Sequence, residues 1–152
     1  MPTHYKGSTR EARALDTFIK LTRAMETLGS QLQKNLVEHE LTLPQLSVLE
    51  ALLHLGAMSQ SELGRKLLRS NPNMTALLDT LERNGWIQRE RSPEDRRVVV
   101  VSLTREGQRV IEKAFPAHAA RIAELMGALS ADEQQQLGQL CKKLGLSLSS
   151  GG

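Results

Sequence analysis

The sequence has little cysteine and few aromatic residues. Among its 152 residues, Cys141 is the single cysteine, and aromatic side chains account for 3%. One cysteine excludes an intrachain disulfide, which is typical of proteins from a reducing cytosol. Since aromatics are scarce, leucine, valine, isoleucine, alanine and methionine must build the core, and a hydrophobic content of 39% is sufficient for one.

The sequence also lacks the apolar segments that direct a chain to or through a membrane. Its start, Met-Pro-Thr-His-Tyr-Lys-Gly, does not resemble a signal peptide, and no apolar stretch is long enough to span a bilayer. We therefore expect a soluble, cytoplasmic protein. The C-terminal residues 147–152 have the serine- and glycine-rich composition of a disordered tail.

Motifs for catalysis and metal binding are missing as well. The sequence contains no glycine-rich phosphate loop, no His-Glu-x-x-His helix and no nucleophile elbow, so we do not expect an enzyme. The histidines are far apart and lack the spacing of metal ligands; they are His4, His39, His54 and His118. We therefore expect no metal and no cofactor.

What the sequence does contain is a regular series of helix-start signals. A serine or threonine precedes a Glu or Gln by three positions, the spacing of a capping box, at Ser8 with Glu11, Thr42 with Gln45, Ser59 with Glu62, and Ser130 with Glu133. With the spacing of apolar residues, these signals predict helices over 9–38, 44–55, 59–68, 104–129 and 130–145. A further helix is predicted between Ser70 or Asn71, as its cap, and Gly85. Pro116 should kink or break the helix over 104–129.

The first two predicted helices differ in how their apolar residues are arranged. Between Leu15 and Leu36 the first helix carries an apolar stripe along one face, and its length takes this stripe beyond a small globular core. Another surface must therefore cover the stripe. The second helix is apolar on most sides, which predicts a central, buried position.

The middle of the sequence combines two short helices with a hairpin. The helix over 59–68 and the helix that starts near Asn71 are separated by three or four residues, which is the helix–turn–helix pattern. Two β-prone runs, Trp86–Arg91 and Val98–Leu103, then flank a polar turn and predict a hairpin. The predicted fold is therefore mainly α with a small β-hairpin wing, a winged helix–turn–helix with flanking helices.

The first turns of the second short helix carry candidate DNA contacts. Its side chains there are Ser70, Asn71, Asn73, Thr75 and Ala76. The major groove admits one α-helix, in which asparagine can pair with adenine, and serine or threonine can reach a phosphate or a base edge. Capping alone would also explain Ser70 and Asn71, and the two roles are compatible.

The hairpin tip carries a second group of candidates. Arg96 and Arg97 are adjacent to Asp95, with Arg89 further down the strand, and the net charge of +3 permits a nucleic-acid partner. An arginine gains from the negative potential of a narrow minor groove, and Asp95 can hold a guanidinium in an extended pose. A charged hairpin tip is usually solvated surface, but its position directly after a helix–turn–helix favours a DNA contact.

These residues carry a family resemblance. The run from Ser70 to Arg89, the wing Pro93-Glu94-Asp95-Arg96-Arg97 and the segment Leu103-Thr104-Arg105-Glu106-Gly107 resemble the DNA-binding lobe of the MarR family of bacterial transcriptional regulators. The resemblance of this lobe covers Leu41 to Gly107. Its most specific part is the Asp-x-Arg wing followed by a valine-rich strand.

The resemblance implies a domain organisation and a partner. It implies a homodimer in which the first, fifth and sixth helices of both subunits interleave. The domains are then a dimerisation helix (1–40), a winged DNA-binding lobe (41–104), C-terminal dimerisation helices (105–146) and the tail (147–152). The partner is double-stranded DNA of the bacterial nucleoid, and two-fold symmetry implies a pseudo-palindromic operator with half-sites about one helical turn apart.

The resemblance also implies roles for individual residues. By position, Arg97 is the arginine that enters the minor groove, and Asp95 is the residue that positions it. Thr75 contacts a phosphate, while Asn71 and Asn73 lie near the bases. These roles separate contacts that place the protein on the backbone from contacts that select a sequence.

The resemblance further implies a repressor that a small effector releases from DNA. Many family members respond to an aromatic or lipophilic acid, and the segments Tyr5-Lys6-Gly7 and Arg23-Ala24 resemble a subgroup that responds to phenols and quinones. No motif identifies the effector site. Two alternatives stay open: a winged-helix module that binds protein, and a thiol switch through Cys141. The apolar stripe on which Cys141 lies favours a buried, inert thiol instead.

Overall fold

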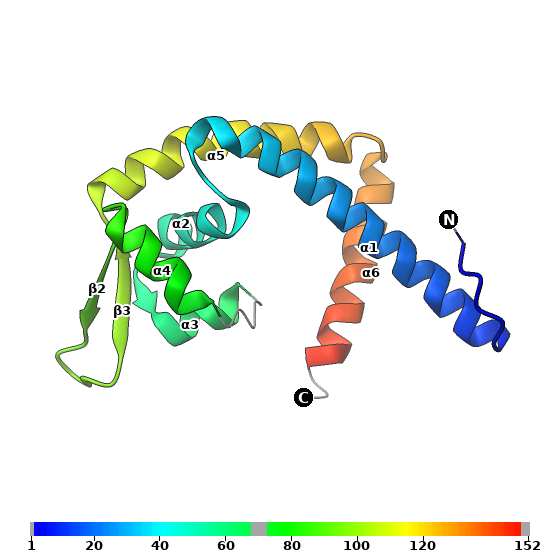
Figure 1. Ribbon diagram of the computed structural model, residues 1–152, viewed down its shortest axis with the longest axis horizontal. Helices are drawn as coiled ribbons and strands as arrows, with labels where there is room; N and C mark the ends of the chain where they lie inside the picture. The colour runs from blue at the N-terminus through cyan, green and yellow to red at the C-terminus, as the bar shows by residue number, and fades with distance from the viewer. Residues whose placement is uncertain (1, 68–72, 150–152) are drawn as a thin grey trace. The chain divides into compact units, whose positions relative to one another are not determined.

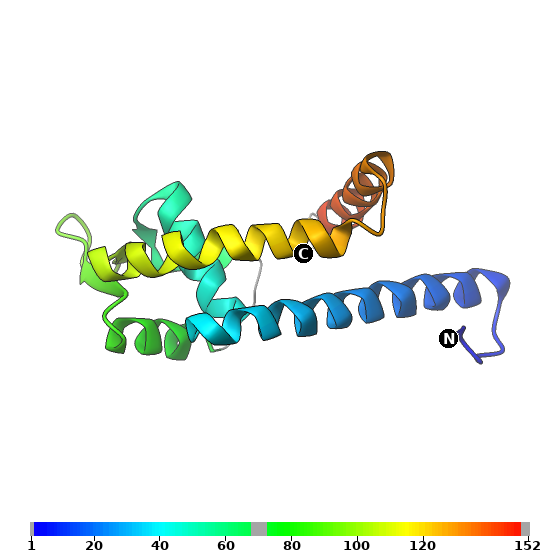
Figure 2. The same ribbon diagram turned by 90° about the horizontal axis from the view of Figure 1, so that it is seen from above.

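The computed structural model describes residues 2–67 and 73–149 and consists of two compact units, residues 1–118 and 119–152. Figures 1 and 2 show a chain that is mostly helical, with one small sheet. In chain order the elements are α1 (Thr9–Leu36), the 3-10 helix η1 (Val37–His39), α2 (Leu43–Leu55), β1 (Met58–Ser59), α3 (Gln60–Lys66), α4 (Met74–Arg83), β2 (Ile87–Arg91), β3 (Val99–Leu103), α5 (Arg105–Met126) and α6 (Ala131–Ser149).

The helix starts follow the predicted caps. At α1 and α2, the hydroxyls of Ser8 and Thr42 accept hydrogen bonds from the third helical residue, whose side chain reaches back to the cap in both cases. At α6, the Ser130 amide donates to Glu133 Oε1 (2.9 Å) and the Glu133 amide donates to Ser130 Oγ (3.2 Å). Because these caps satisfy orphan amide groups locally, the sequence alone is enough to locate the starts of these three helices.

The sheet has one strand more than the sequence predicted. β2 and β3 form the expected antiparallel hairpin, with Ile87 opposite Leu103 and Arg91 opposite Val99. β1 pairs with the other side of β3, so the strand order is β1-β3-β2. Two residues are too few to show a strand period in the sequence, which is why β1 was not predicted.

The core is centred on α2, as the apolar character of that helix predicted. Its Leu46, Val48, Leu49 and Leu52 are buried, and they lie in one cluster with side chains of every other element of the first unit except η1. The first half of α5 belongs to this core, because Ile111, Ala114 and His118 are also buried there. The first compact unit extends to residue 118 and therefore includes the first half of α5.

Three details differ from the sequence-based expectation. The fourth helix begins at Met74, later than the predicted start near Asn71; Ser70 and Asn71 lie outside the described residues. α6 continues to Ser149, so the tail predicted as disordered is helical over 147–149, where serine hydroxyls donate to the carbonyls of Leu144 and Leu146. α5 runs through Pro116 without a break.

Apolar side chains stay exposed on two helices. On α1, Phe18 is 64% exposed and Met25 is 61% exposed, and the N-terminal half of this helix extends away from α2, α3 and α4 (Figures 1 and 2). On α6, Leu140 is 65% exposed, and Cys141 is exposed as well. The side chain of Cys141 is therefore exposed in the single chain, whereas the apolar stripe favoured a buried thiol. Among the described residues, no helix is long and apolar enough to cross a membrane.

Candidate nucleic-acid interface

Helix α4 has a buried face and a polar, exposed face. Leu78 and Leu81 are fully buried, whereas Asn73, Thr75 and Ala76 are exposed at its N-terminal end. The helix ends at Arg83, and Gly85, two residues later, has the left-handed φ of +78° that the sequence predicted. The Trp86 amide donates back to the Leu81 carbonyl (3.0 Å). The N-terminal end of α4 therefore presents small side chains to solvent, while the opposite face of the helix is anchored in the core.

At the hairpin tip, Asp95 holds Arg97. Arg97 Nε donates to Asp95 Oδ1 (3.1 Å), Arg97 Nη2 donates to Oδ2 (3.2 Å), and the Arg97 amide also donates to Oδ1 (3.1 Å). These hydrogen bonds, the side-chain ones first, lower the pKa of Asp95 below its usual value. The Arg97 side chain is nevertheless 91% exposed. The carboxylate thus orients a guanidinium that remains open to solvent, as the sequence predicted for this pair.

Backbone hydrogen bonds close the turn that carries the tip. The Ser92 amide donates to the Val98 carbonyl (2.8 Å), and the Val98 amide donates to the Asp95 carbonyl (2.9 Å). Arg91 Nη1 donates to the carbonyl of Arg96 (2.7 Å), while the Arg96 side chain itself has no protein partner among the described residues. The structure therefore brings Asp95, Arg96 and Arg97 together as predicted.

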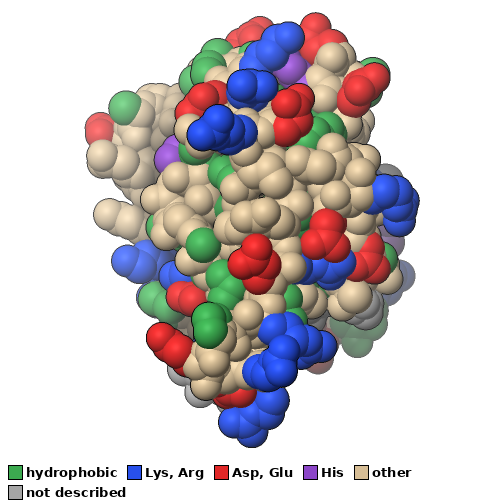
Figure 3. Space-filling model, turned by 90° about the vertical axis from the view of Figure 1, so that its left-hand side faces the viewer, with side chains coloured by type: hydrophobic (Ala, Val, Ile, Leu, Met, Phe, Trp, Pro, Cys, Tyr) green, Lys and Arg blue, Asp and Glu red, His purple; other side chains and the backbone are tan. Residues whose placement is uncertain are grey.

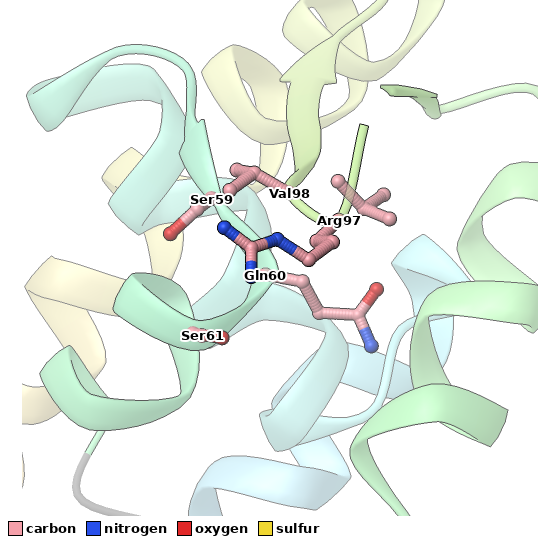
Figure 4. Close-up of a pocket in the computed structure, with 6 residues that line it drawn as sticks. Ser59, Gln60, Ser61, Arg97 and Val98 are labelled. Atoms are coloured by element: carbon pink, nitrogen blue, oxygen red, sulfur yellow. The ribbon is translucent and has the colours of Figure 1, made fainter. Parts of the chain in front are cut away.

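A pocket of about 350 Å³ lies between the hairpin and the start of α3. Its lining residues are Ser59, Gln60, Ser61, Arg97, Val98 and Val99. Figure 4 shows the guanidinium of Arg97 pointing toward Ser59 at the beginning of α3. Figure 3 shows basic side chains gathered at the lower end of the face that carries the hairpin. The wing tip is therefore adjacent to the first helix of the helix–turn–helix.

Arg89 lies on the strand where the sequence placed it, but its side chain contacts α4. It is in the middle of β2, and its Nη2 donates to Asp79 and, over 2.9 Å, to Glu82 Oε1 on α4. The Arg89 amide also donates to Glu82 Oε2 (3.1 Å), and the guanidinium lowers the pKa of Glu82. Its side chain is only 18% exposed. The sequence grouped Arg89 with the hairpin arginines, because it contains no signal that pairs a strand residue with Asp79 and Glu82.

The histidines and the cysteine do not form a metal centre. Across residues 2–67 and 73–149, no group of three or more His, Cys, Asp or Glu side chains is placed to hold a metal ion. His54 contacts the Phe115 ring edge-on (5.4 Å between ring centroids), and Phe115 in turn lies 6.2 Å from His118. These histidines pack against an aromatic ring of the core.

Comparison with known proteins agrees with this geometry. The model of the MarR family matches residues 41–99. The chain is 37% identical over 134 residues to the HTH-type transcriptional regulator YkoM of Bacillus subtilis, covering 88% of this chain and 87% of YkoM. It is 33% identical over 135 residues to the B. subtilis HTH-type regulator MhqR, covering 89% and 93%. A crystal structure of mutant MarR from E. coli complexed with operator DNA superposes with a TM-score of 0.78 at 27% identity, covering 91% of this chain and 99% of that one.

The exposed end of α4 and the arginine-bearing hairpin, set on one core, define a winged helix–turn–helix protein that binds DNA and regulates transcription. Its relatives YkoM and MhqR are HTH-type transcriptional regulators. More narrowly, the family model and the relatives show that the chain belongs to the MarR family.

Proposed function

We propose that the protein is a homodimeric repressor that binds a pseudo-palindromic operator in the bacterial nucleoid and leaves it when a small phenolic compound or lipophilic acid binds. The observation that carries the DNA-binding part is the Asp95–Arg97 pair. Because Asp95 accepts three hydrogen bonds from Arg97, the arginine loses little conformational freedom when it enters a minor groove.

Helix α4 supplies the major-groove contacts in this proposal. Thr75 contacts a phosphate, and Asn73 lies near the bases; both are exposed at the end of the helix that points out of the core. The assignments of Ser70 and Asn71 depend on the sequence alone. Ala76 leaves room for close approach of the helix to a base edge, and Arg96 adds a phosphate contact beside Arg97.

The exposed apolar side chains support the dimer. Phe18 and Met25 lie on the stripe that the sequence predicted for α1, and Leu140 and Leu144 lie on the stripe of α6. Exposed apolar residues in such rows mark protein interfaces. We assign both stripes to a second copy of the chain, and a dimer with two wings requires a two-fold symmetric operator.

A binding assay tests the DNA contacts. Duplexes selected by the wild-type protein from a random-sequence library serve as the probe, and a duplex of unselected sequence serves as the non-specific reference. We expect Arg97→Ala to weaken binding of the selected duplex by about 1–3 kcal/mol, roughly fivefold to 150-fold, and to reduce the salt dependence by about one counterion. Arg109→Ala removes an exposed arginine of α5 and is the matched control, for which we expect neither change.

Two results would contradict the proposal at different points. Full-strength binding by Arg97→Ala would exclude the role of the wing arginine. If the wild-type protein enriched no sequence at low salt, operator binding itself would be excluded. A selected sequence without two-fold symmetry, together with a monomer mass by light scattering at assay concentrations, would contradict the dimer.

Effector release has a separate test. Membership of the family and the Tyr5-Lys6-Gly7 and Arg23-Ala24 segments support a phenolic or lipophilic acid as the ligand. We expect compounds of this class, titrated against the complex with the selected duplex, to release the DNA. A panel of phenols, quinones and aromatic acids without any such effect would refute this part and leave the DNA contacts in place.

A further inference from the structure

Arg89, Asp79 and Glu82 form a cluster that joins β2 to α4; we call it the strand–helix clamp. Ile87 and Arg89 lie on one face of β2, since side chains alternate along a strand, and this face is turned toward α4. Ile87 is buried in the core, and Arg89 continues the contact outward as an ion pair. Helix α4 and the hairpin, which carry the proposed DNA contacts, are thus connected by an apolar contact at Ile87 and by an ion pair at Arg89.

Glu82 fixes both the side chain and the backbone of Arg89. β2 is an edge strand, and the Arg89 amide donates to Glu82 Oε2 instead of to a neighbouring strand (3.1 Å). The other oxygen, Oε1, accepts from Nη2 of the same residue (2.9 Å), and Asp79 accepts from that nitrogen as well. A contact to the backbone sets the position of the strand along the helix, which a side-chain ion pair alone would not do.

The charge of the clamp argues against a direct DNA contact by Arg89. Its guanidinium shares space with two carboxylates, so the cluster carries a net negative charge, and the Arg89 side chain is largely covered. A phosphate would have to displace two carboxylates and then lie beside them. Arg97 has one carboxylate partner and is almost fully exposed. Of the two arginines, Arg97 is therefore the one whose charge is available to a phosphate.

We propose that Arg89 is a positioning residue, which locks the wing to the recognition helix so that both reach their grooves in one fixed geometry. This inference rests on the proposed roles of α4 and the wing. A helix in the major groove and an arginine in the adjacent minor groove must be in register with each other. If the protein fixes their spacing before binding, the complex loses less entropy on forming.

The double variant Asp79→Asn/Glu82→Gln separates a positioning role of Arg89 from a DNA contact, because the two roles predict opposite changes in DNA affinity. The variant removes two negative charges near DNA and frees the Arg89 guanidinium. If Arg89 contacted DNA, binding would strengthen. We expect roughly tenfold weaker binding of the duplex selected by the wild-type protein, with unchanged or tighter binding of the unselected duplex.

Glu90→Gln/Glu94→Gln is the matched control. It makes the same change of charge on the hairpin, and no ion pair of the clamp is lost. We expect this control to bind the selected duplex at least as tightly as the wild-type protein does. A merely structural role of the clamp would lower stability without changing the ratio of selected to unselected binding among folded molecules, so this ratio is the deciding measurement.

Arg89→Gln completes a mutant cycle. We expect it to weaken binding of the selected duplex in the wild-type background, to leave the salt dependence unchanged, and to cause little further loss in the Asp79→Asn/Glu82→Gln background. Tighter binding by the double carboxylate variant, or a salt dependence reduced by about one counterion in Arg89→Gln, would overturn the proposal.

Hydrogen exchange on the free protein keeps the inference testable if DNA binding itself fails. We expect Arg89→Gln to speed amide exchange in both α4 and β2, relative to the Glu90→Gln/Glu94→Gln control. Unchanged exchange in α4 would show that the strand and the helix are not coupled through Arg89. If the wild-type protein selected no duplex but Arg89→Gln still sped exchange in α4 and β2, the proposed function would be rejected. The coupling of strand and helix through the clamp would still be supported.

Discussion

Gly107 occupies a corner of the core where any larger residue would force neighbouring atoms to move. A Cβ at this position would lie 1.9 Å from the Trp86 carbonyl oxygen and 2.7 Å from its carbon. The same corner contains three hydrogen bonds: the Thr104 amide donates to the Trp86 carbonyl (3.1 Å), the Thr104 hydroxyl donates to the Gly85 carbonyl (2.6 Å), and the Gly107 amide donates to Thr104 Oγ1 (3.0 Å). The first turn of α5 is thereby pinned to the start of the wing.

The cost of Gly107→Ala follows from this geometry. Ordinary van der Waals contact begins at 3.4 Å, so the first turn of α5 and the Trp86 carbonyl must separate by about 1.5 Å. Overpacking of this kind costs about 1–3 kcal/mol, and weakening one or two of the three hydrogen bonds adds about 1 kcal/mol. We expect a loss of about 2–4 kcal/mol in the free energy of unfolding. In an ordinary helix the same substitution would stabilise the protein by about 0.5–1 kcal/mol.

Urea denaturation at one fixed protein concentration measures this loss. With a denaturant slope of about 2 kcal/mol per molar, the midpoint of Gly107→Ala should fall by about 1–2 M. Gly64→Ala, in α3, is the matched control, because an added Cβ there meets nothing within 4 Å. We expect the midpoint of this control to rise or stay unchanged. Equal stability of Gly107→Ala and the wild-type protein would refute the argument from the close approach.

Three further predictions concern the titration of His118 and the thiol chemistry of Cys141. Burial lowers the pKa of His118 below 6.5, with Glu50 opposing the shift, so the unfolded chain takes up the proton first and stability should decrease as pH falls below about 6.5. His118→Gln should flatten this decrease in urea midpoints; identical pH profiles of the two proteins would exclude His118 as its source. Cys141 is exposed in the single chain, so maleimide labelling should be fast in dilute protein and slow as dimers cover α6; a rate independent of protein concentration would contradict that cover. We expect peroxide to leave DNA binding unchanged in both the wild-type protein and Cys141→Ser. If peroxide changed DNA binding by the wild-type protein but not by Cys141→Ser, the thiol switch would be supported.

Local signals in the sequence predicted most of the secondary structure. The capping pairs that begin at Ser8, Thr42 and Ser130 locate helix starts because their hydrogen bonds join residues three positions apart. Gly85 marks the end of α4 because its positive φ is unfavourable for other residues. Two β-prone runs on either side of a polar turn predicted the hairpin. Each of these signals acts over a few residues, so one sequence is sufficient to detect it.

Contacts between distant residues could not be predicted in this way. β1 forms because Met58 and Ser59 pair with the edge of β3, whose residues lie more than 40 positions further along the chain. The sequence placed Arg89 with the other hairpin arginines, and only the folded chain brings it to Asp79 and Glu82. Likewise, nothing near Gly107 in the sequence indicates that the Trp86 carbonyl will lie against it.

The sequence by itself determined the winged helix–turn–helix order, the exposed polar start of the fourth helix and the Asp95–Arg97 pair, because the interactions that specify them are local or fall within one turn. The tertiary structure decided which arginine is open to solvent and which is held by α4. That decision depends on the packing of β2 against the helix, where burial and two carboxylates give Arg89 an environment unlike that of Arg97. Residue type and charge are the same in both cases, so only the folded environment separates their roles.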